Sequence, residues 1–337
     1  MKHIVLALFL AAGFSGPGPV AVAASAEVGS KSPAALRLET NVDAMGSTFT
    51  VILYGDDENQ MRSASEEAAE EARRLDHMMS NYQPSSEWSE INRQAARLPV
   101  KISQEDFDLI DACIRYSRVS EGAFDITVGP LMKVWGFYKG SGHLPHRAEI
   151  LGALDRVGYR HIILDRQTQT IHFDRPGVEL DPGGIGKGYA VDRMVEVLKR
   201  DGIRTALVGG SASSIYALGA PPSDPRGWKI SIKDPKDRNK TVEDIYLKNE
   251  SMSTSGNYEK FFYAEGRMWS HIMDPRTGYP AQGVLSVSVV APRTIDSEAW
   301  TKPYYVNGRQ WAAHHKPKDF RVFLCEDQKE TPCAWLP

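Results

Sequence analysis

The sequence Leu-Asp-Pro-Gly-Gly-Ile-Gly-Lys-Gly-Tyr-Ala-Val-Asp, at residues 180–192, is the most informative stretch of the chain. It places a glycine-rich turn directly before an apolar pattern that continues to Leu198 and stops at Gly202, which predicts a helix. Glycines let the backbone approach a ligand closely, and a helix N-terminus offers free N–H groups to an anion. Lys187 adds a positive charge at that end. The stretch indicates a phosphate or pyrophosphate site; the alternative is a turn needed only for tight packing.

Two common nucleotide-binding motifs do not match this stretch. A P-loop requires Ser or Thr directly after its lysine, whereas Gly188 follows Lys187 here. The dinucleotide fingerprint requires a βαβ setting, which the surrounding pattern does not offer. The sequence therefore predicts an anion-binding turn of a different kind.

Outward from the turn, hydrophobic patterns predict both helices and strands. Apolar residues at helical spacing predict helices over 61–79 and 104–119, and a β-branched run predicts a strand over 48–54. A hairpin is expected from 161–165 and 170–174.

Short strands dominate the second half of the chain. They are expected at 205–208, 214–218, 228–232, 242–247, 260–263, 269–273 and 284–290. One further helix is expected at about 298–306. Runs of antiparallel strands with a few segregated helices favour one α+β domain with a mostly antiparallel sheet.

Composition excludes several classes of protein. The chain has 337 residues, 42% of them hydrophobic, and a formal net charge of −3. This is ordinary for a globular protein and excludes a largely disordered, collagen-like or coiled-coil chain. A charge near zero gives no net field to attract a nucleic-acid backbone, so we expect no nucleic-acid partner.

The N-terminus has the pattern of a secretory signal peptide. An apolar run at 4–14 follows Lys2, and small residues in an A-x-A pattern end near residue 26. The run is too short to span a bilayer, and no later segment is apolar for long enough to form a membrane helix. No cysteine follows the run, so no lipid anchor is expected. We expect residues 1–26 to be removed, residues 27–40 to form a flexible leader, and the mature protein to be periplasmic or secreted; the alternative is a buried N-terminal helix.

The three cysteines are too few for a disulfide framework. In an oxidising compartment Cys325 and Cys333 can pair and fasten the C-terminal tail. Cys113 sits in an apolar helical pattern, which favours a buried, inert thiol.

Three further segments suggest chemistry. His271 comes just before the Asp-Pro-Arg-Thr-Gly turn at 274–278, where it can act as a general base or can simply be a structural histidine. Phe124 could pack against a ring while Asp125 bonds its polar edge, with core packing as the alternative. The hydroxyls of residues 251–256 suit a phosphate-facing loop, or a plain turn.

Seven ordered segments together resemble the ApbE family of flavin-trafficking enzymes of the bacterial periplasm. In chain order they read MGSTF, SNYQPSSEWSEIN, GAFDITVGPLMKVWGF, LDPGGIGKGYAVD, GGSASSIYALG, SMSTSGNYEKFF and SHIMDPRTGYPA. The resemblance runs from about Met45 to Gly308, which is most of the mature chain. Any one segment is a weak signal, whereas seven in order are a strong one.

The resemblance implies a T-fold-like α+β architecture that binds FAD, over residues 41–310, with 311–337 as a C-terminal extension of the same domain. His271 matches the histidine proposed to activate the acceptor hydroxyl, and the main-chain carbonyl of Gly184 matches a metal ligand. Contacts to FAD are implied for Met45, Tyr82, Ala123, Phe124, Asp125, Asp181, Lys187 and Ile272.

The implied reaction is FAD:protein FMN transfer. The family cuts the FAD pyrophosphate, attaches FMN through a phosphoester bond to a Thr or Ser of a target protein, and releases AMP. Mg²⁺ together with Lys187 would neutralise the pyrophosphate. The implied targets are membrane redox subunits or secreted flavoproteins that carry a Thr/Ser flavinylation motif.

The sequence departs from the family at its last metal-binding stretch, which usually reads Ala-Asp with a Thr four residues after the Asp. The matching stretch here puts Glu298 at the Asp position and Lys302 at the Thr position. An ammonium group at a Mg²⁺ ligand position should repel the metal. Three explanations are open: Asp296 and Thr301 serve as the ligands instead, Lys302 replaces part of the cation's charge, or the site binds FAD without turning it over.

Two other functions therefore stand beside the transferase. One is a periplasmic FAD-binding protein with little catalysis, because a fold alone does not decide an activity. The other is an FAD pyrophosphatase, in which water replaces the acceptor hydroxyl and the products are FMN and AMP.

Overall fold

The computed structural model describes residues 35–140, 142–328 and 333–337. The expected signal peptide, residues 1–26, lies outside the described residues. Within those described ranges, no helix combines the length and the hydropathy needed to cross a membrane.

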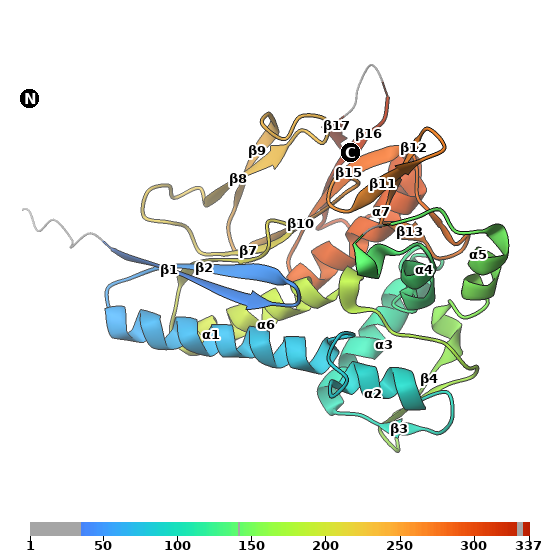
Figure 1. Ribbon diagram of the computed structural model, residues 1–337. Helices are drawn as coiled ribbons and strands as arrows, with labels where there is room; N and C mark the ends of the chain where they lie inside the picture. The colour runs from blue at the N-terminus through green and yellow to red at the C-terminus, as the bar shows by residue number, and fades with distance from the viewer. Residues whose placement is uncertain (1–34, 141, 329–332) are drawn as a thin grey trace, which may run out of the picture. The chain divides into compact units, whose positions relative to one another are not determined.

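The main sheet has eight strands in the order β1-β2-β6-β7-β10-β15-β16-β17 (Figure 1). Every neighbouring pair in this sheet is antiparallel. In sheet order the strands are Leu36–Ala44 (β1), Ser47–Gly55 (β2), Thr205–Gly210 (β6), Ser214–Leu218 (β7), Glu250–Gly256 (β10), Val284–Ala291 (β15), Arg321–Glu326 (β16) and Cys333–Trp335 (β17).

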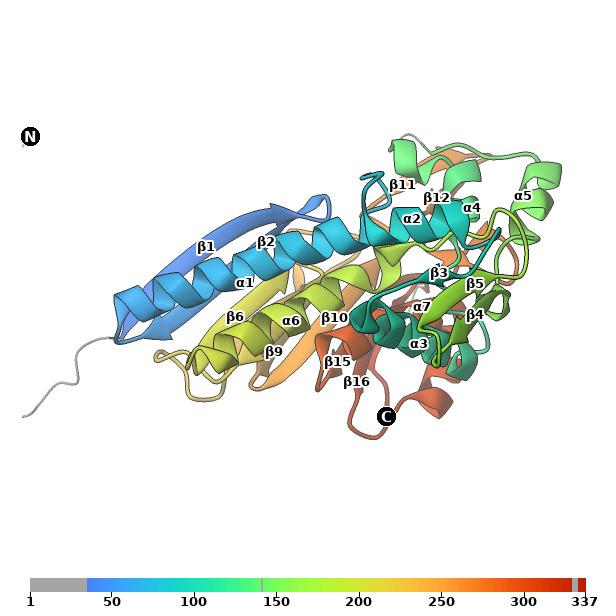
Figure 2. The same ribbon diagram turned by 90° about the horizontal axis from the view of Figure 1, so that it is seen from below.

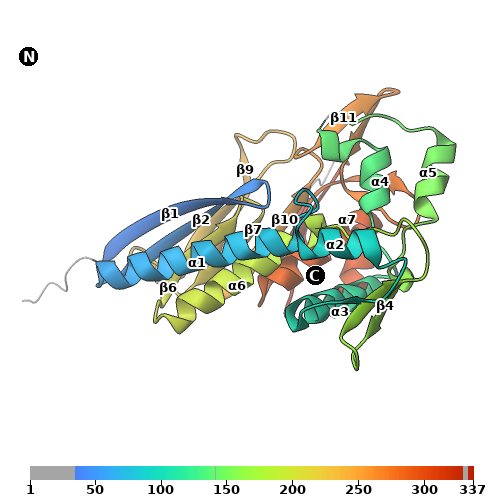
Figure 3. The ribbon, with the colours of Figure 1, turned by 60° about the horizontal axis from the view of Figure 1, so that its bottom comes forward.

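Three helices cover one face of this sheet: α1 (Glu58–Met79), α6 (Gly186–Arg200) and α7 (Thr294–His315). Figures 2 and 3 show α1 and α6 side by side across the strands. The apolar positions of α1 and α6 recur at helical spacing, and they are buried against one face of β2 and β6. Helix α7 lies on β10 and β15 and is kinked at Gly308, whose φ of 76° is not helical.

The opposite face of the sheet is covered by a two-stranded hairpin, β8 (Trp228–Lys233) and β9 (Thr241–Leu247). Strand β2 shows the division of the two faces. Phe49, Val51 and Leu53 are buried under the helices, whereas Ile52 and Tyr54 pack in the cluster that contains the hairpin. This alternation follows from the two-residue period of a strand.

The remaining elements carry most of the loops that reach the site. A three-stranded sheet is formed by β3 (Val100–Lys101), β5 (Thr170–Phe173) and β4 (Ile162–Asp165), and two short hairpins by β11 (Phe261–Ala264) with β12 (Arg267–Ser270) and β13 (Met273–Asp274) with β14 (Tyr279–Pro280). The helices here are α2 (Glu87–Gln94), α3 (Gln104–Val119), α4 (Gly129–Val134) and α5 (Arg147–Leu154), with short 3₁₀ turns η1 (Phe137–Lys139), η2 (Tyr159–His161) and η3 (Pro182–Gly184).

The expected α+β class with a mostly antiparallel sheet and segregated helices is confirmed. The helix expected at 104–119 is α3 itself, because Ser103 accepts from the Asp106 N–H and caps its first turn. The helix expected at 61–79 and the hairpin of β4 and β5 are also present.

Three local expectations differ from the structure. The strand expected at 269–273 is divided, since β12 ends at Ser270 and β13 begins at Met273. Residues 36–40 belong to β1 rather than to a flexible leader, because β1 pairs with β2 along its whole length. Residues 251–256 form an inner strand, β10, rather than a loop or plain turn, because β7 and β15 supply its hydrogen-bond partners on both sides.

The pairing of Cys325 and Cys333, which the sequence left open, is present as a disulfide that joins β16 to the edge strand β17. Cys113 is a buried free thiol, as expected, and burial raises its pKa above the ordinary value. The tail beyond residue 310 therefore supplies a buried strand and its covalently attached neighbour.

Removing this disulfide should lower the free energy of unfolding by about 2 kcal/mol, because the cross-link restricts a short loop of the unfolded chain. Urea unfolding of the Cys325→Ser, Cys333→Ser double variant measures the change. The oxidised wild-type protein is the reference, and an unchanged midpoint in the variant would contradict a stabilising role.

Candidate active site

The glycine-rich turn begins at Asp181, which caps the short turn η3. The Asp181 carboxylate accepts a hydrogen bond from the Gly183 N–H at 2.6 Å and another from the Tyr138 hydroxyl. Burial raises the pKa of Asp181, while these donors and the charge of Lys260 oppose the shift. Asp181 therefore fixes the turn that leads into α6.

Gly188 lies where α6 packs directly against α7. Its N–H donates to Glu298 Oε2. A Cβ added at Gly188 would lie 2.6 Å from the Thr294 carbonyl oxygen, which is far inside van der Waals contact. The same two helices are joined again where Asp192 accepts from the Thr294 N–H at 2.7 Å and from the Ile295 N–H at 2.9 Å.

Two lysines share the buried carboxylate of Glu298. Lys187 Nζ is 3.4 Å and Lys302 Nζ is 3.9 Å from Glu298 Oε1. Burial lowers the pKa of Lys302 to about 8, with Lys187 lowering it further and Glu298 raising it. Lys302 thus remains predominantly protonated at neutral pH.

His271 lies just beyond β12, beside the same group of lysines. Its Nδ1 is 3.2 Å from the Lys260 carbonyl oxygen. A carbonyl oxygen only accepts, so Nδ1 carries the proton. Among the described residues Nε2 of the neutral ring has no hydrogen-bond partner, so it can accept a proton. Burial lowers the pKa of His271 to about 4, and the charges of Lys260, Lys302 and Lys187 lower it too. His271 is therefore a neutral base at physiological pH.

Aromatic side chains flank the turn. Tyr82 is 72% exposed, and its ring meets that of Tyr138 edge to face with centroids 6.0 Å apart. The ring of Phe137 lies 6.4 Å from that of His271. The pair Tyr138 and Phe137 thus connects the Asp181 end of the turn to the histidine.

Two more expected residues meet the turn directly. A Cβ added at Gly184 would lie 3.3 Å from Phe124 Cε2 and 3.5 Å from Lys302 Cε, so both side chains lie against this glycine. Met45 lies at the tip of the β1–β2 hairpin with a φ of 53°, and its Sδ would lie 3.7 Å from a Cβ at Gly186. The structure therefore brings together Met45, Tyr82, Phe124, Asp181, Gly184, Lys187, His271, Glu298 and Lys302.

Like Phe124 and Asp181, three other expected nucleotide contacts have buried side chains. The Asp125 carboxylate accepts from the N–H and hydroxyl of Thr127 and from the Tyr159 N–H, at 2.6–2.8 Å. Burial raises the pKa of Asp125. This carboxylate therefore braces its loop, and the expected bond to the polar edge of a flavin ring stays a prediction. Ala123 and Ile272 are buried as well, the latter in the core beneath α7.

Sequence reasoning missed Tyr138 and Lys260. Tyr138 follows directly after the third family segment, but its bond to Asp181 depends on tertiary structure. Lys260 lies within the sixth segment, third from its end, but it holds His271 through a main-chain carbonyl, which leaves no signature in the side-chain pattern.

The serine hydroxyls of β10 contact α7. Ser253 Oγ lies 2.8 Å from Ser297 Oγ, and Ser255 Oγ lies 2.8 Å from Thr301 Oγ1. Asp296 is bonded to Arg293 and to the Tyr116 hydroxyl. Asp296 and Thr301 are therefore both committed to structural contacts, which argues against them as substitute metal ligands.

The residues around Gly184 do not fit a divalent cation. Within the described ranges, no group of three or more His, Cys, Asp or Glu side chains is placed to hold a metal. Glu298 is the single carboxylate of the expected set, and two ammonium groups and a main-chain N–H already engage it. A Mg²⁺ at the Lys302 position would lie against a positive charge.

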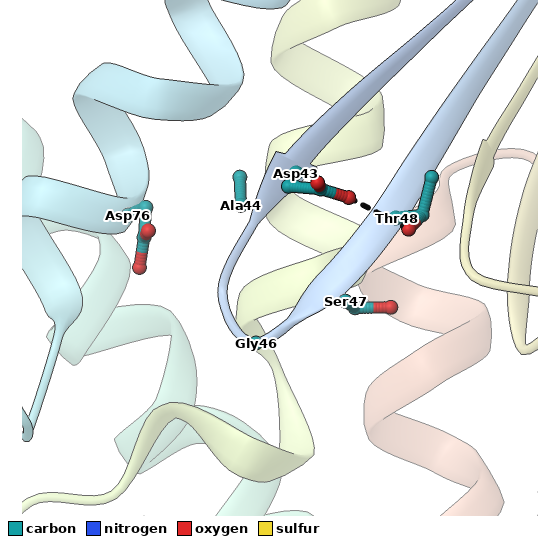
Figure 4. Close-up of a pocket in the computed structure, with 6 residues that line it drawn as sticks. All are labelled: Asp43, Ala44, Gly46, Ser47, Thr48 and Asp76. Atoms are coloured by element: carbon teal, nitrogen blue, oxygen red, sulfur yellow. Dashed lines mark hydrogen bonds between the residues drawn. The ribbon is translucent and has the colours of Figure 1, made fainter.

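A shallow pocket of about 370 Å³ lies between the β1–β2 turn and α1 (Figure 4). It is lined by Asp43, Ala44, Gly46, Ser47, Thr48 and Asp76. Two aspartates make it a poor site for a pyrophosphate. The candidate site is instead the turn itself, where the lysines and His271 gather.

The fold and this site define an α+β protein whose glycine-rich helix start, lysine pair and neutral histidine suit a phosphate-containing ligand. The chain belongs to the ApbE family, whose sequence pattern matches residues 45–323. Two curated relatives named FAD:protein FMN transferase support this. The protein from Klebsiella pneumoniae is 33% identical over 76% of this chain and 78% of its own length. The protein from Salmonella typhimurium is 31% identical over 92% of this chain and 89% of its own length.

Solved structures agree with the sequence relatives. The ApbE protein from Thermotoga maritima superposes with a TM-score of 0.80 at 29% identity, covering 87% of this chain and 95% of its own. The flavin transferase ApbE from Vibrio cholerae has a TM-score of 0.76 at 25% identity, covering 89% and 96%. The expected family and architecture are thus confirmed.

Proposed function

We propose that this protein is an FAD:protein FMN transferase that attaches FMN to a Thr or Ser hydroxyl of a target protein and releases AMP. The names of its relatives support the activity. The observation that carries the proposal is the neutral His271, with Nε2 free, beside lysines that line the glycine-rich turn. A base next to an anion site is what transfer of a phosphoryl group to a hydroxyl requires.

In the proposed reaction, the acceptor oxygen attacks the phosphorus of the FMN half of FAD. The bond from that phosphorus to the bridging oxygen breaks, and AMP leaves with the bridging oxygen. The acceptor's proton passes to His271 Nε2. Lys187 balances charge on the phosphate oxygens, while Asp181 holds the turn that carries the main-chain N–H groups.

No step of this reaction is assigned to the expected Mg²⁺, because Glu298 is already paired with Lys187 and Lys302. Mg²⁺ would supply Lewis-acid charge on the pyrophosphate where it binds. In the proposed complex, the ammonium groups of Lys187 and Lys302 supply positive charge at the glycine-rich turn instead.

The proposed location is the periplasm or the exterior of a bacterium, and the proposed targets are membrane redox subunits or secreted flavoproteins with a Thr/Ser flavinylation motif. The disulfide between Cys325 and Cys333 supports an oxidising compartment.

Coupled product analysis tests the proposed function. The chain from residue 35 is incubated with FAD, with and without an acceptor domain, and AMP and FMN are measured by chromatography. AMP that appears only with acceptor, without free FMN, supports the transferase. AMP and free FMN in equal amounts without acceptor would indicate a pyrophosphatase, and bound FAD with no AMP would indicate a binding protein.

The dependence of kcat/KM on pH should reflect the lowered pKa of His271. A base must be unprotonated, so kcat/KM should stay level from pH 7 to about 5 and fall only as the pH approaches the pKa of about 4. A histidine at its ordinary value of 6.5 would lose activity across that same range. An acidic limb centred near 6.5 would contradict the lowered pKa and neutral state of His271.

A further inference from the structure

The charge arrangement at Glu298 is unusual for a metal site. The Glu298 side chain is 3% exposed, and both of its oxygens are engaged, Oε1 by two lysines and Oε2 by the Gly188 N–H. Two positive charges therefore face one negative charge before any ligand binds. The net charge of this group is positive. It lies at the N-terminus of α6, where the helix dipole contributes further positive potential.

Lys302 is held in place by its own helix. It lies one turn after Glu298 on α7, and its Nζ donates to the Glu298 carbonyl oxygen at 3.1 Å. Its Cε lies 3.5 Å from the position of a Cβ at Gly184, so the stem passes over this glycine. An ammonium group fixed in this way at the glycine-rich turn needs little further ordering when an anion binds.

Lys187 completes the arrangement from α6. Its side chain is 26% exposed and that of Lys302 is 21% exposed, so each keeps a solvent-facing part that a ligand can reach. The charges of Lys187 and Lys302 both lower the pKa of His271, so the histidine lies within reach of their electrostatic field. The phosphates of a dinucleotide carry negative charge, and the net positive charge of the two lysines and Glu298 can balance part of it.

We infer that Lys302 and Lys187 together supply the positive charge that holds the FAD pyrophosphate, so that this chain binds FAD and transfers FMN without a divalent cation. The transfer part of this inference rests on the proposed function. As the bond to the bridging oxygen breaks, negative charge grows on the leaving AMP, and a fixed ammonium group stabilises it without a metal.

The experiment compares FAD affinity in excess EDTA and in excess Mg²⁺, using flavin fluorescence and the described chain from residue 35. For the wild type we expect dissociation constants within about threefold of each other, and transfer rates to an acceptor domain within the same factor. Lys302→Met should weaken FAD binding in EDTA by about tenfold or more, because a charge-assisted bond is lost. Lys302→Arg should keep most of the affinity, because it keeps the charge.

A matched control is Lys236→Met, which removes an exposed lysine that pairs with Asp327 at the other face of the sheet. It should leave FAD affinity unchanged. If Lys302→Met does not fold, as judged by circular dichroism, the wild-type EDTA comparison and the Lys302→Arg variant still decide the question.

Lys302→Thr tests the same position from the other direction. Replacing the ammonium with a neutral oxygen donor should make FAD binding respond to Mg²⁺, with affinity in EDTA reduced and partly restored by the metal. If FAD binding by Lys302→Thr does not respond to Mg²⁺, the residue at position 302 does not determine metal dependence, and this result would count against the inference.

Two results would overturn the inference: loss of wild-type FAD binding in EDTA that Mg²⁺ restores, or a Lys302→Met variant that binds FAD as the wild type does. Failure of the proposed function looks different. In that case FAD binds without metal and Lys302→Met weakens it, but no acceptor is modified in either buffer while an active relative modifies the same acceptor.

Discussion

Replacing His271 with alanine should abolish FMN transfer and leave FAD affinity within about tenfold of the wild type. A base acts mainly in the transition state, so its removal costs rate rather than ground-state binding, by about a hundredfold or more. The geometry supports this division, because the Nδ1 of His271 bonds to a main-chain carbonyl and its Nε2 remains free for an incoming hydroxyl. Single-turnover transfer and FAD titration measure the two effects separately.

The control is His314→Ala, which removes a histidine whose Nδ1 also bonds to a main-chain carbonyl, that of Gln310, but on the exposed end of α7. It should change neither transfer nor binding. Parallel loss of FAD affinity and transfer in His271→Ala would mean that His271 holds the ligand rather than acting as a base.

Gly188→Ala should destabilise the protein by about 3 kcal/mol and weaken FAD binding. The added Cβ would lie 2.6 Å from the Thr294 carbonyl oxygen and 2.8 Å from Glu298 Oε2, so α6 and α7 must move apart. Overpacking of this kind costs about 1–3 kcal/mol, and the bond from the Gly188 N–H to the Glu298 carboxylate is weakened as well. Because Glu298 positions Lys187 and Lys302, the loss should reach the ligand site.

Gly152→Ala is the matched control. Gly152 lies on α5, is exposed, and has no neighbour within 4 Å of an added Cβ. This change should stabilise the protein slightly, by about 0.5–1 kcal/mol, because alanine restricts the unfolded chain. Urea unfolding separates the two variants, and a Gly188→Ala protein as stable as Gly152→Ala would contradict the close packing of α6 on α7.

The sequence predicts those helices and strands whose caps, apolar spacing and turns lie in neighbouring residues. Helix α3 has a serine cap and apolar residues at helical spacing, and the hairpin of β4 and β5 has strand residues around a turn. The segment at 251–256 has neither signal. It forms an inner strand because β7 and β15 pair with its backbone, and two of its serine hydroxyls bond to α7, about 45 residues away in sequence. Both are tertiary effects.

The candidate site shows the same limit. Lys187, His271, Asp181 and Lys302 stand out in the sequence because their motifs and the family resemblance mark them. The roles of Tyr138 and Lys260 depend on contacts across the fold, and so does the internal bonding of Asp125. The pairing of Glu298 with two lysines joins α6 to α7, so only the assembled fold places these charges together.

Tandem mass spectrometry of an acceptor domain incubated with this chain and FAD tests the central claim most directly. The account predicts an FMN-sized mass gain on one Thr or Ser of the acceptor, present with wild-type protein and absent with His271→Ala. An acceptor that stays unmodified, while a relative of proven activity modifies it in parallel, would contradict the assignment of this chain as a flavin transferase.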